Sequence, residues 1–315
     1  MLRLVVRRLL FIVPTLFLVS LLIFVMEEVV PGDVGRTILG PYAPADRVAA
    51  LDHQLGTDKP LPERYASWLG GFVTLHWGES PILQQQVFPV TMQRLWNSAQ
   101  LAALALVIII PLSIVLGIVA ALRRDGILDR VITVTSLSLT VVPEFVSGVV
   151  LLVVFAVILK LFPVTAAAPP GSGPLTRIHY LILPAIPLMF VELGYIARMA
   201  RAGMIEALDT AYVRTATLKG LPRRRVVLNH ALRNAMVPTV AVIGTQIGWL
   251  VGGLVVVETL FNYPGIGKLM ADSATFKDVR VLEATVLVVA AIYMLSNLTA
   301  DVIVALLNPR VRHER

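Results

Sequence analysis

Residues Gly265–Lys268 read Gly-Ile-Gly-Lys and place a lysine beside two glycines, as in the phosphate-binding loop of many nucleotide-binding proteins. That loop follows the pattern G-x4-G-K-[ST], in which backbone amides cradle the phosphates and a hydroxyl holds magnesium. Here Asn262 stands where the first glycine is needed, and Leu269 replaces the serine or threonine. The sequence therefore does not predict ATP binding by this route.

Groups that could carry out hydrolysis inside a membrane are not paired either. Such chemistry needs a Ser–His pair, two facing aspartates or an H-E-x-x-H helix. None of the five histidines lies in the middle of a long apolar segment, and Asp301 is the only aspartate within one. Cysteine is absent, which excludes thiolate nucleophiles and cysteine metal sites. We expect a non-catalytic chain with no catalytic residue, no metal site and no cofactor of its own.

Glu144 directly follows Pro143 in the middle of the apolar segment Val131–Leu159. Lipid penalises an acid at such depth by about 2.5–3.5 kcal/mol on insertion scales. Either Glu144 lines a solute path where Pro143 breaks the helix, or it is paired within a bundle or lies at a shallower depth. Glu192 and Asp301 lie nearer the ends of their apolar segments, so we expect structural roles for them.

The composition places these residues in a bilayer. Of 315 residues, 57% are apolar and 15% are charged, and the mean hydropathy is +0.81. Soluble domains are about 45–50% apolar and about 25% charged. A membrane-crossing helix needs about 20 mostly apolar residues, and lipid leaves no partner for unpaired backbone groups. The sequence predicts an all-α membrane protein with six transmembrane helices: Leu9–Val30, Leu95–Leu122, Val131–Leu159, Ile178–Ala197, Asn234–Val257 and Val281–Leu307.

Basic residues set the expected orientation. With the N-terminus inside, the inner segments hold 17 basic and five acidic residues, a net charge of +12, whereas the outer segments carry −1. The positive-inside rule then places both termini in the cytoplasm. The same rule explains the overall charge of +7 without nucleic acid as a partner. The basic start resembles a secretory signal, but the apolar run is too long and lacks a small-residue cleavage site.

This topology divides the chain into four parts. Residues 1–30 form the N-terminal transmembrane helix, and 31–94 form an extracytoplasmic loop. Residues 95–307 form a five-helix core, and 308–315 form a cytoplasmic tail. The outer loop is too long for a mere connection, and we expect it to form a small folded cap or to lie on the membrane interface.

The inner loop, residues 198–233, is basic and patterned. Gly203–Leu208 and Ala211–Ala216 are expected to form short helices. Gly220 is then suited to end one helix, and Pro222 to begin the next.

The fifth apolar segment carries Gly244, Gly248 and Gly252 at four-residue spacing. Such a stripe lets helix backbones approach closely, so we expect this helix to be central in the bundle. Gln246 and Trp249 on the same helix are candidates, with Glu144, for lining a solute path.

Three separated stretches resemble one known family. Residues 212–221 read YVRTATLKGL, 230–235 read HALRNA, and 257–269 read VETLFNYPGIGKL. They are similar to ATP-binding-cassette importer permeases, and more narrowly to the B-type permease of the dipeptide/oligopeptide family. The general loop pattern is E-A-A-x3-G-x9-I-x-L-P. Anchored on Gly220, this chain has Arg-Thr-Ala for E-A-A and His-Ala-Leu-Arg for I-x-L-P, and these departures follow the peptide branch. Outer-loop motifs and Pro31–Asp33 extend the resemblance over essentially the whole chain.

The resemblance implies a type I importer permease fold in a bacterial inner membrane, with this chain forming half of the translocation pore. Its implied partners are a homologous C-type permease, two ATPase subunits that bind ATP and magnesium, and an extracytoplasmic solute-binding protein. That protein would dock on the outer residues 31–94 and 258–280. The implied substrates are dipeptides or oligopeptides. Other members move nickel complexes or haem. Outside the family, a proton-coupled carrier would use Glu144 and Asp301 as a relay.

By resemblance, Ala211–Gly220 is a coupling helix seated in a groove of an ATPase. Gly220 would allow the sharp turn after it, while Tyr212 would act as an anchor and Arg214 as an ionic contact. The alternative is an amphipathic helix lying on lipid headgroups. The coupling residues implied are Ala211, Tyr212, Val213, Arg214, Thr215, Ala216, Lys219, Gly220 and Leu221.

Overall fold

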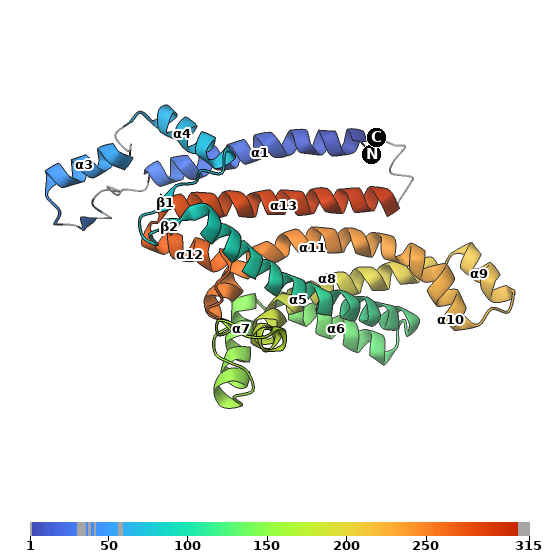
Figure 1. Cartoon of the computed structure of the whole chain (residues 1–315). Coiled ribbons are helices and arrows are strands. Elements are labelled where there is room, and N and C mark those ends of the chain that lie inside the picture. Colours follow the sequence, from blue (N-terminus) through green and yellow to red (C-terminus); the bar gives the residue numbers. More distant parts are fainter. Residues whose placement is uncertain (1, 30–35, 37–38, 41, 56–58, 308–315) are drawn as a thin grey trace. The chain divides into compact units, whose positions relative to one another are not determined.

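The computed structural model of the chain describes residues 2–29, 36, 39–40, 42–55 and 59–307 (Figure 1). Pro31–Asp33 and the expected cytoplasmic tail, residues 308–315, lie outside the described residues. The chain forms two compact units. The first comprises Met1–Val6, Ala99–Tyr263 and Tyr293–Arg315, and the second comprises Arg7–Ser98 and Pro264–Ile292.

Five helices among the described residues are long and apolar enough to cross a membrane. Four of them contain a predicted segment in full, and α1 contains the described part of Leu9–Val30, so the prediction of membrane-spanning helices in these five places is confirmed. The longest of them run beyond the apolar core of the predicted segment at one or both ends. The five are α1 (Leu2–Val29), α5 (Val87–Leu122), α8 (Pro174–Leu208), α11 (Leu232–Leu260) and α13 (Val279–Leu307).

The predicted third crossing, Val131–Leu159, is not one continuous helix. The structure has α6 (Ile127–Val141), then α7 (Glu144–Leu151) with a π-helical continuation, η1 (Leu152–Ile158). The two parts meet at an angle of 99°. Pro143 causes the break, because proline has no N–H to donate and its ring collides with the preceding turn. Counted as one broken span, the pair supplies the sixth crossing.

Helix α8 is the central element of the first unit and packs against α6, α7 and α11. Two glycines allow its backbone to approach its neighbours. A β-carbon at Gly194 would overlap Ser136 and Thr140 of α6, and one at Gly203 would overlap the carbonyl of Ala235 in α11. A separate apolar core is drawn from α5, η1, α8, α11 and the segments that follow them: Leu101, Ala105, Ala156, Leu183, Leu188, Val257 and Phe261.

The inner loop is shorter than the sequence suggested. The prediction of a separate helix over Gly203–Leu208 is wrong, because α8 continues unbroken to Leu208. The glycine within it faces a neighbouring helix and does not interrupt the backbone. The next helix is α9 (Ala211–Leu218), as predicted. Pro222 then precedes α10 (Arg223–Arg225) and a second π-helical turn, η2 (Val226–Ala231), leads into α11.

The second unit folds much of the outer loop into helices. It contains α3 (Ala45–Leu55), α4 (Leu61–Val73), α12 (Ile266–Phe276) and a hairpin of β1 (Glu79–Ser80) and β2 (Gln85–Gln86). The strands are antiparallel, with Glu79 opposite Gln86.

Aromatic rings connect the elements of this unit. Tyr65 of α4 packs edge-on against Phe24 of α1, with ring centroids 5.3 Å apart, and its hydroxyl lies 2.7 Å from the Ser20 hydroxyl. Trp77 stacks on Phe72 at 4.7 Å and donates its indole N–H to the Phe72 carbonyl. These contacts pack α4 against α1 and hold the segment that follows α4 against it.

The tight approach at Gly203 yields a stability prediction. Gly203→Ala should lower the melting temperature of the detergent-solubilised protein, because overpacking a filled contact costs about 1–3 kcal/mol. Gly252→Ala is the matched control, since a β-carbon there meets nothing within 4 Å. The control should melt at or above the wild-type temperature because alanine favours helix. Equal melting of the two variants would contradict the packing described here.

Candidate functional site

Helix α9 is fastened to the first unit by its apolar face. Val213 and Ala216, three residues apart, are both buried. They join an apolar cluster contributed by α5, α8, η2 and α11: Ala121, Met204, Ala207, Val226, Val227, Ala231 and Ala235. Burial of this face fixes the rotation of α9 about its axis, and therefore decides which side chains it presents to solvent.

The residues assigned to coupling by resemblance fall on two faces. Val213, Ala216 and Leu221 belong to the inner packing. The exposed members are Ala211, Tyr212, Arg214, Thr215, Lys219 and Gly220. The most exposed large apolar side chain of α9, Leu218 at 82%, was not among the predicted residues. Its helical phase relative to the apolar pair Val213 and Ala216 is the sequence signal that could have found it.

Tyr212 has an internal partner. The Asn234 side-chain amide, at the start of α11, donates a hydrogen bond of 2.9 Å to the Tyr212 hydroxyl. The ring stays 40% exposed. Tyr212 therefore ties α9 to α11 through its hydroxyl while part of the residue stays exposed.

Gly220 ends the helix in a left-handed conformation with φ of +76°. Its N–H donates to the Thr217 carbonyl at 3.0 Å. A β-carbon at this position would meet nothing within 4 Å. The backbone conformation, which costs a non-glycine residue about 1–2 kcal/mol, is thus the reason for glycine here, as the sequence predicts.

The surroundings of α9 are strongly basic. Arg214 and Lys219 lie on its exposed side, and all three arginines of α10 (Arg223–Arg225) are exposed. The Arg223 guanidinium reaches the Leu122 carbonyl at the end of α5, at 3.4 Å. A surface of this charge attracts an acidic protein partner or an anionic membrane.

The candidates for a solute path separate into two environments. Glu192 is 2% exposed, and the Gln246 amide lies within hydrogen-bonding reach of its carboxyl. Glu144, in the first turn of α7, is half-buried and lies beside Gly253 of α11 and near Glu192. Trp249 is 70% exposed and does not share this buried region. The structure thus brings together Glu144, Glu192 and Gln246, although the sequence suggested only a structural role for Glu192.

The glycine stripe of α11 faces α13 over part of its length. A β-carbon at Gly244 would overlap Ala300, and one at Gly248 would lie 3.1 Å from the Tyr293 ring. Gly252 has open space beside it. Asp301, next along α13, is partly buried. In the described part of the chain, no group of three or more His, Cys, Asp or Glu side chains is placed to hold a metal ion.

Comparison with known proteins gives consistent matches along the chain. Residues 113–313 match the family described as binding-protein-dependent transport system inner membrane component, and residues 1–95 match its N-terminal family. The di/tripeptide transport system permease protein of Pseudomonas aeruginosa is 35% identical, with all of both chains covered. The glutathione transport system permease protein of Escherichia coli K12 is 36% identical over all of both chains. A probable peptide ABC transporter permease protein of Sinorhizobium fredii is 32% identical over 98% of this chain and 99% of its own.

The two faces of α9 should respond differently to a charge. Val213→Asp places an unpaired carboxylate in the apolar cluster, which should lower the free energy of opening the loop by about 1–3 kcal/mol. The loop should then open more often, and trypsin should cleave at Arg223–Arg225 about tenfold faster. Leu218→Asp should leave the cleavage rate unchanged, because the side chain is already exposed. Limited proteolysis of the purified variants measures both. Equal cleavage rates would show that α9 is not packed in this orientation.

Proposed function

The chain belongs to the binding-protein-dependent transport system inner membrane components, and on that basis we propose that it is the B-type permease of an ATP-driven importer for short peptides. The family match covers most of the chain, and its helices make it a multi-pass membrane protein. Relatives that match it over its whole length carry names that specify di/tripeptide and glutathione transport, and glutathione is itself a tripeptide. Short peptides are therefore the substrate class best supported.

The observation that carries the coupling proposal is the arrangement of α9. The chain lacks a phosphate-binding loop, so the work of transport must come from a separate ATPase. Helix α9 is fixed to the bundle through Val213 and presents Leu218 between the cations Arg214 and Lys219. Burial of one exposed leucine in a partner's groove stabilises a complex by about 1.5–3 kcal/mol. Helix α9 thus has the form expected of a protruding helix that binds in a groove of an ATPase.

The same arrangement argues against α9 as a lipid-lying helix. Interfacial helices keep a broad apolar face for the membrane and a charged face for water. In α9 the apolar pair Val213 and Ala216 is already used against the bundle. Leu218 and part of the Tyr212 ring remain, which is too little apolar area for stable binding to a membrane surface.

The orientation follows from the same assignment. The inner loop carries a large share of the basic excess, and the positive-inside rule places it in the cytoplasm, where ATP is available. Both termini then lie in the cytoplasm, and α3, α4, α12 and the hairpin lie outside.

The outer elements are suited to receive a solute-binding protein. Both stretches expected to dock it contribute to the second unit. They are joined there by direct contacts, since the Ser80 hydroxyl bonds the Asp278 carboxylate and the Arg280 guanidinium donates to the Glu79 carbonyl at 3.1 Å. The remaining half of the pore would come from a homologous C-type permease, with which this chain would form a heterodimer.

Association with the ATPase should depend on Leu218. Leu218→Asp should weaken retention of the ATPase subunits by about tenfold or more, the equivalent of about 1.4 kcal/mol. Leu218→Met is the matched control, because it keeps an apolar side chain of similar volume, and it should retain them as the wild type does. Quantitative co-purification from membranes measures this. Normal retention by the aspartate variant would mean that α9 is not the contact.

The energy source is tested in proteoliposomes that hold the assembled complex. Peptide uptake should stop when vanadate blocks the ATPases and should continue when the proton gradient is collapsed. The opposite pattern would contradict an ATP-driven importer and would support a proton-coupled carrier that uses Glu144 and Asp301.

A further inference from the structure

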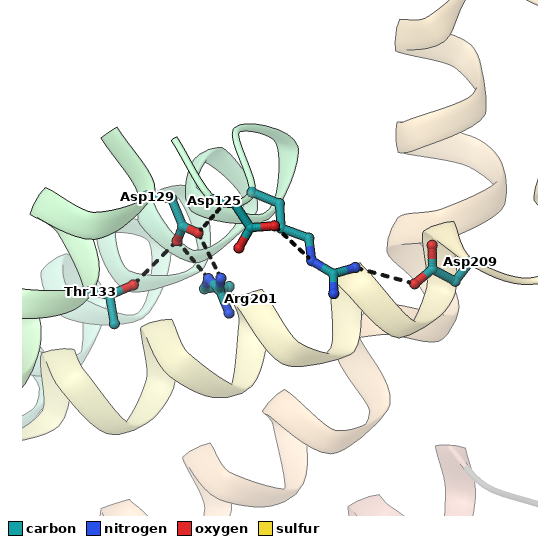
Figure 2. A network of polar contacts seen from close by, with 6 residues as sticks. Asp125, Asp129, Thr133, Arg201 and Asp209 are labelled. Atoms are coloured by element: carbon teal, nitrogen blue, oxygen red, sulfur yellow. Dashed lines mark hydrogen bonds and ion pairs between the residues drawn. The ribbon is translucent and has the colours of Figure 1, made fainter. Parts of the chain in front are cut away.

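An ion pair with a buried carboxylate joins the start of α6 to the C-terminal part of α8, close to the α5–α6 turn (Figure 2). The Arg201 guanidinium donates from Nε to Oδ1 of Asp129 at 2.6 Å and from Nη2 to Oδ2 at 2.7 Å. Asp129 is only 3% exposed. Such two-pronged contacts fix orientation as well as distance, because the planar guanidinium matches the carboxylate edge.

The Asp129 carboxylate also holds the turn that precedes α6. The backbone N–H of Asp125 donates to its Oδ2 at 3.0 Å, and the Thr133 hydroxyl lies 3.3 Å from Oδ1. Asp125 itself is left-handed, with φ of +64°. One carboxylate therefore joins the α5–α6 turn, the first turns of α6 and the side of α8.

Helix α8 is clamped on a second side at the same level. A β-carbon at Gly117 of α5 would lie 2.5 Å from the Ala197 carbonyl oxygen and 2.7 Å from the Ala200 β-carbon. From Arg201 the helix continues without a break to Leu208, and α9 begins at Ala211. Arg201 is therefore joined to α9 by a short stretch of continuous helix and the two residues Asp209 and Thr210.

On the other side of the pair, α6 leads to the bend at Pro143. Beyond that bend, α7 begins with Glu144, which is half-buried and lies near the buried Glu192 and Gln246. The pair thus stands between the surface assigned to the ATPase and the broken span within the bundle.

We propose that the Asp129–Arg201 ion pair is a positioning element that transmits the movement of α9 to α6 and, through the bend at Pro143, to α7. This inference rests on the proposed coupling role of α9. Removal of Arg201 leaves the buried Asp129 carboxylate without its partner, and removal of Asp129 releases the partly exposed guanidinium; either change loosens α6 from α8. The ATPases should then still bind and hydrolyse ATP, but less of that work should reach the bundle.

A neighbouring set of contacts supplies a matched control. Arg124 lies 3.7 Å from the Asp125 carboxylate and 3.5 Å from that of Asp209 (Figure 2). All three side chains are more than half exposed. Exposed pairs of this kind contribute little, because water screens them and long side chains lose entropy when held. Arg124→Gln removes an arginine at the same end of the bundle without touching the buried pair.

The test is the number of peptides taken up per ATP hydrolysed by the complete importer in proteoliposomes, with radiolabelled dialanine and trialanine. Asp129→Asn and Arg201→Gln should lower this ratio about tenfold, within the usual range of coupling between sites, with normal co-purification of the ATPases. Arg201→Lys, which keeps the charge but cannot make both contacts, should give an intermediate ratio. Arg124→Gln should match the wild type.

The outcomes separate this inference from the one it rests on. An unchanged ratio in Asp129→Asn, or in Arg201→Lys if the other variants do not accumulate, would overturn the positioning role alone. So would loss of the ATPases from the variant complexes, because it would show a merely structural role. A wild-type complex that imports neither peptide under ATP would overturn the proposed function itself.

Discussion

The close packing of α8 against its neighbours is the constraint on which the rest of the first unit depends. Small residues on several sides let the backbones of α5, α6 and α11 approach it, at Gly117, Gly194 and Gly203. Lipid-exposed helices gain little from apolar burial, so contact between backbones is a main source of their association. Because α8 is held this tightly and is continuous from Pro174 to Leu208, α9 begins at a defined position beside the bundle.

Because α8 is fixed, the two faces of α9 have different roles. The inner face contributes stability through the buried cluster, and the outer face is left for a partner. Gly220 ends the helix through a left-handed turn, so the chain returns to the bundle at once. The arrangement joins a long membrane helix to a short helix with one exposed face, which is a suitable geometry for passing force from a soluble ATPase to the bundle.

Much of this could be predicted from the sequence, because the physics of a bilayer is simple. The lengths of the apolar runs identified the membrane crossings. Gly220 marked the end of α9, and Pro222 marked the start of the next helix. The sequence failed where tertiary packing overrides local signals. Gly203 looked like the start of a separate helix. It lies within α8, where it faces Ala235 of α11. The 99° bend at Pro143 depends on how α7 packs. The Asp129–Arg201 contact joins residues 72 positions apart, and no local pattern reports such a pairing.

The central claim is that the outer face of α9 lies against an ATPase subunit, and the absence of cysteine from the chain makes a direct measurement possible. Leu218→Cys, labelled with a short photoactivatable cross-linker in native membranes, should form a product that contains this chain and the ATPase. The same label at Leu175, which is 84% exposed at the far end of α8, should not. A Leu218 label that reacts only with lipid, or with no protein at all, would show that α9 does not contact the ATPase.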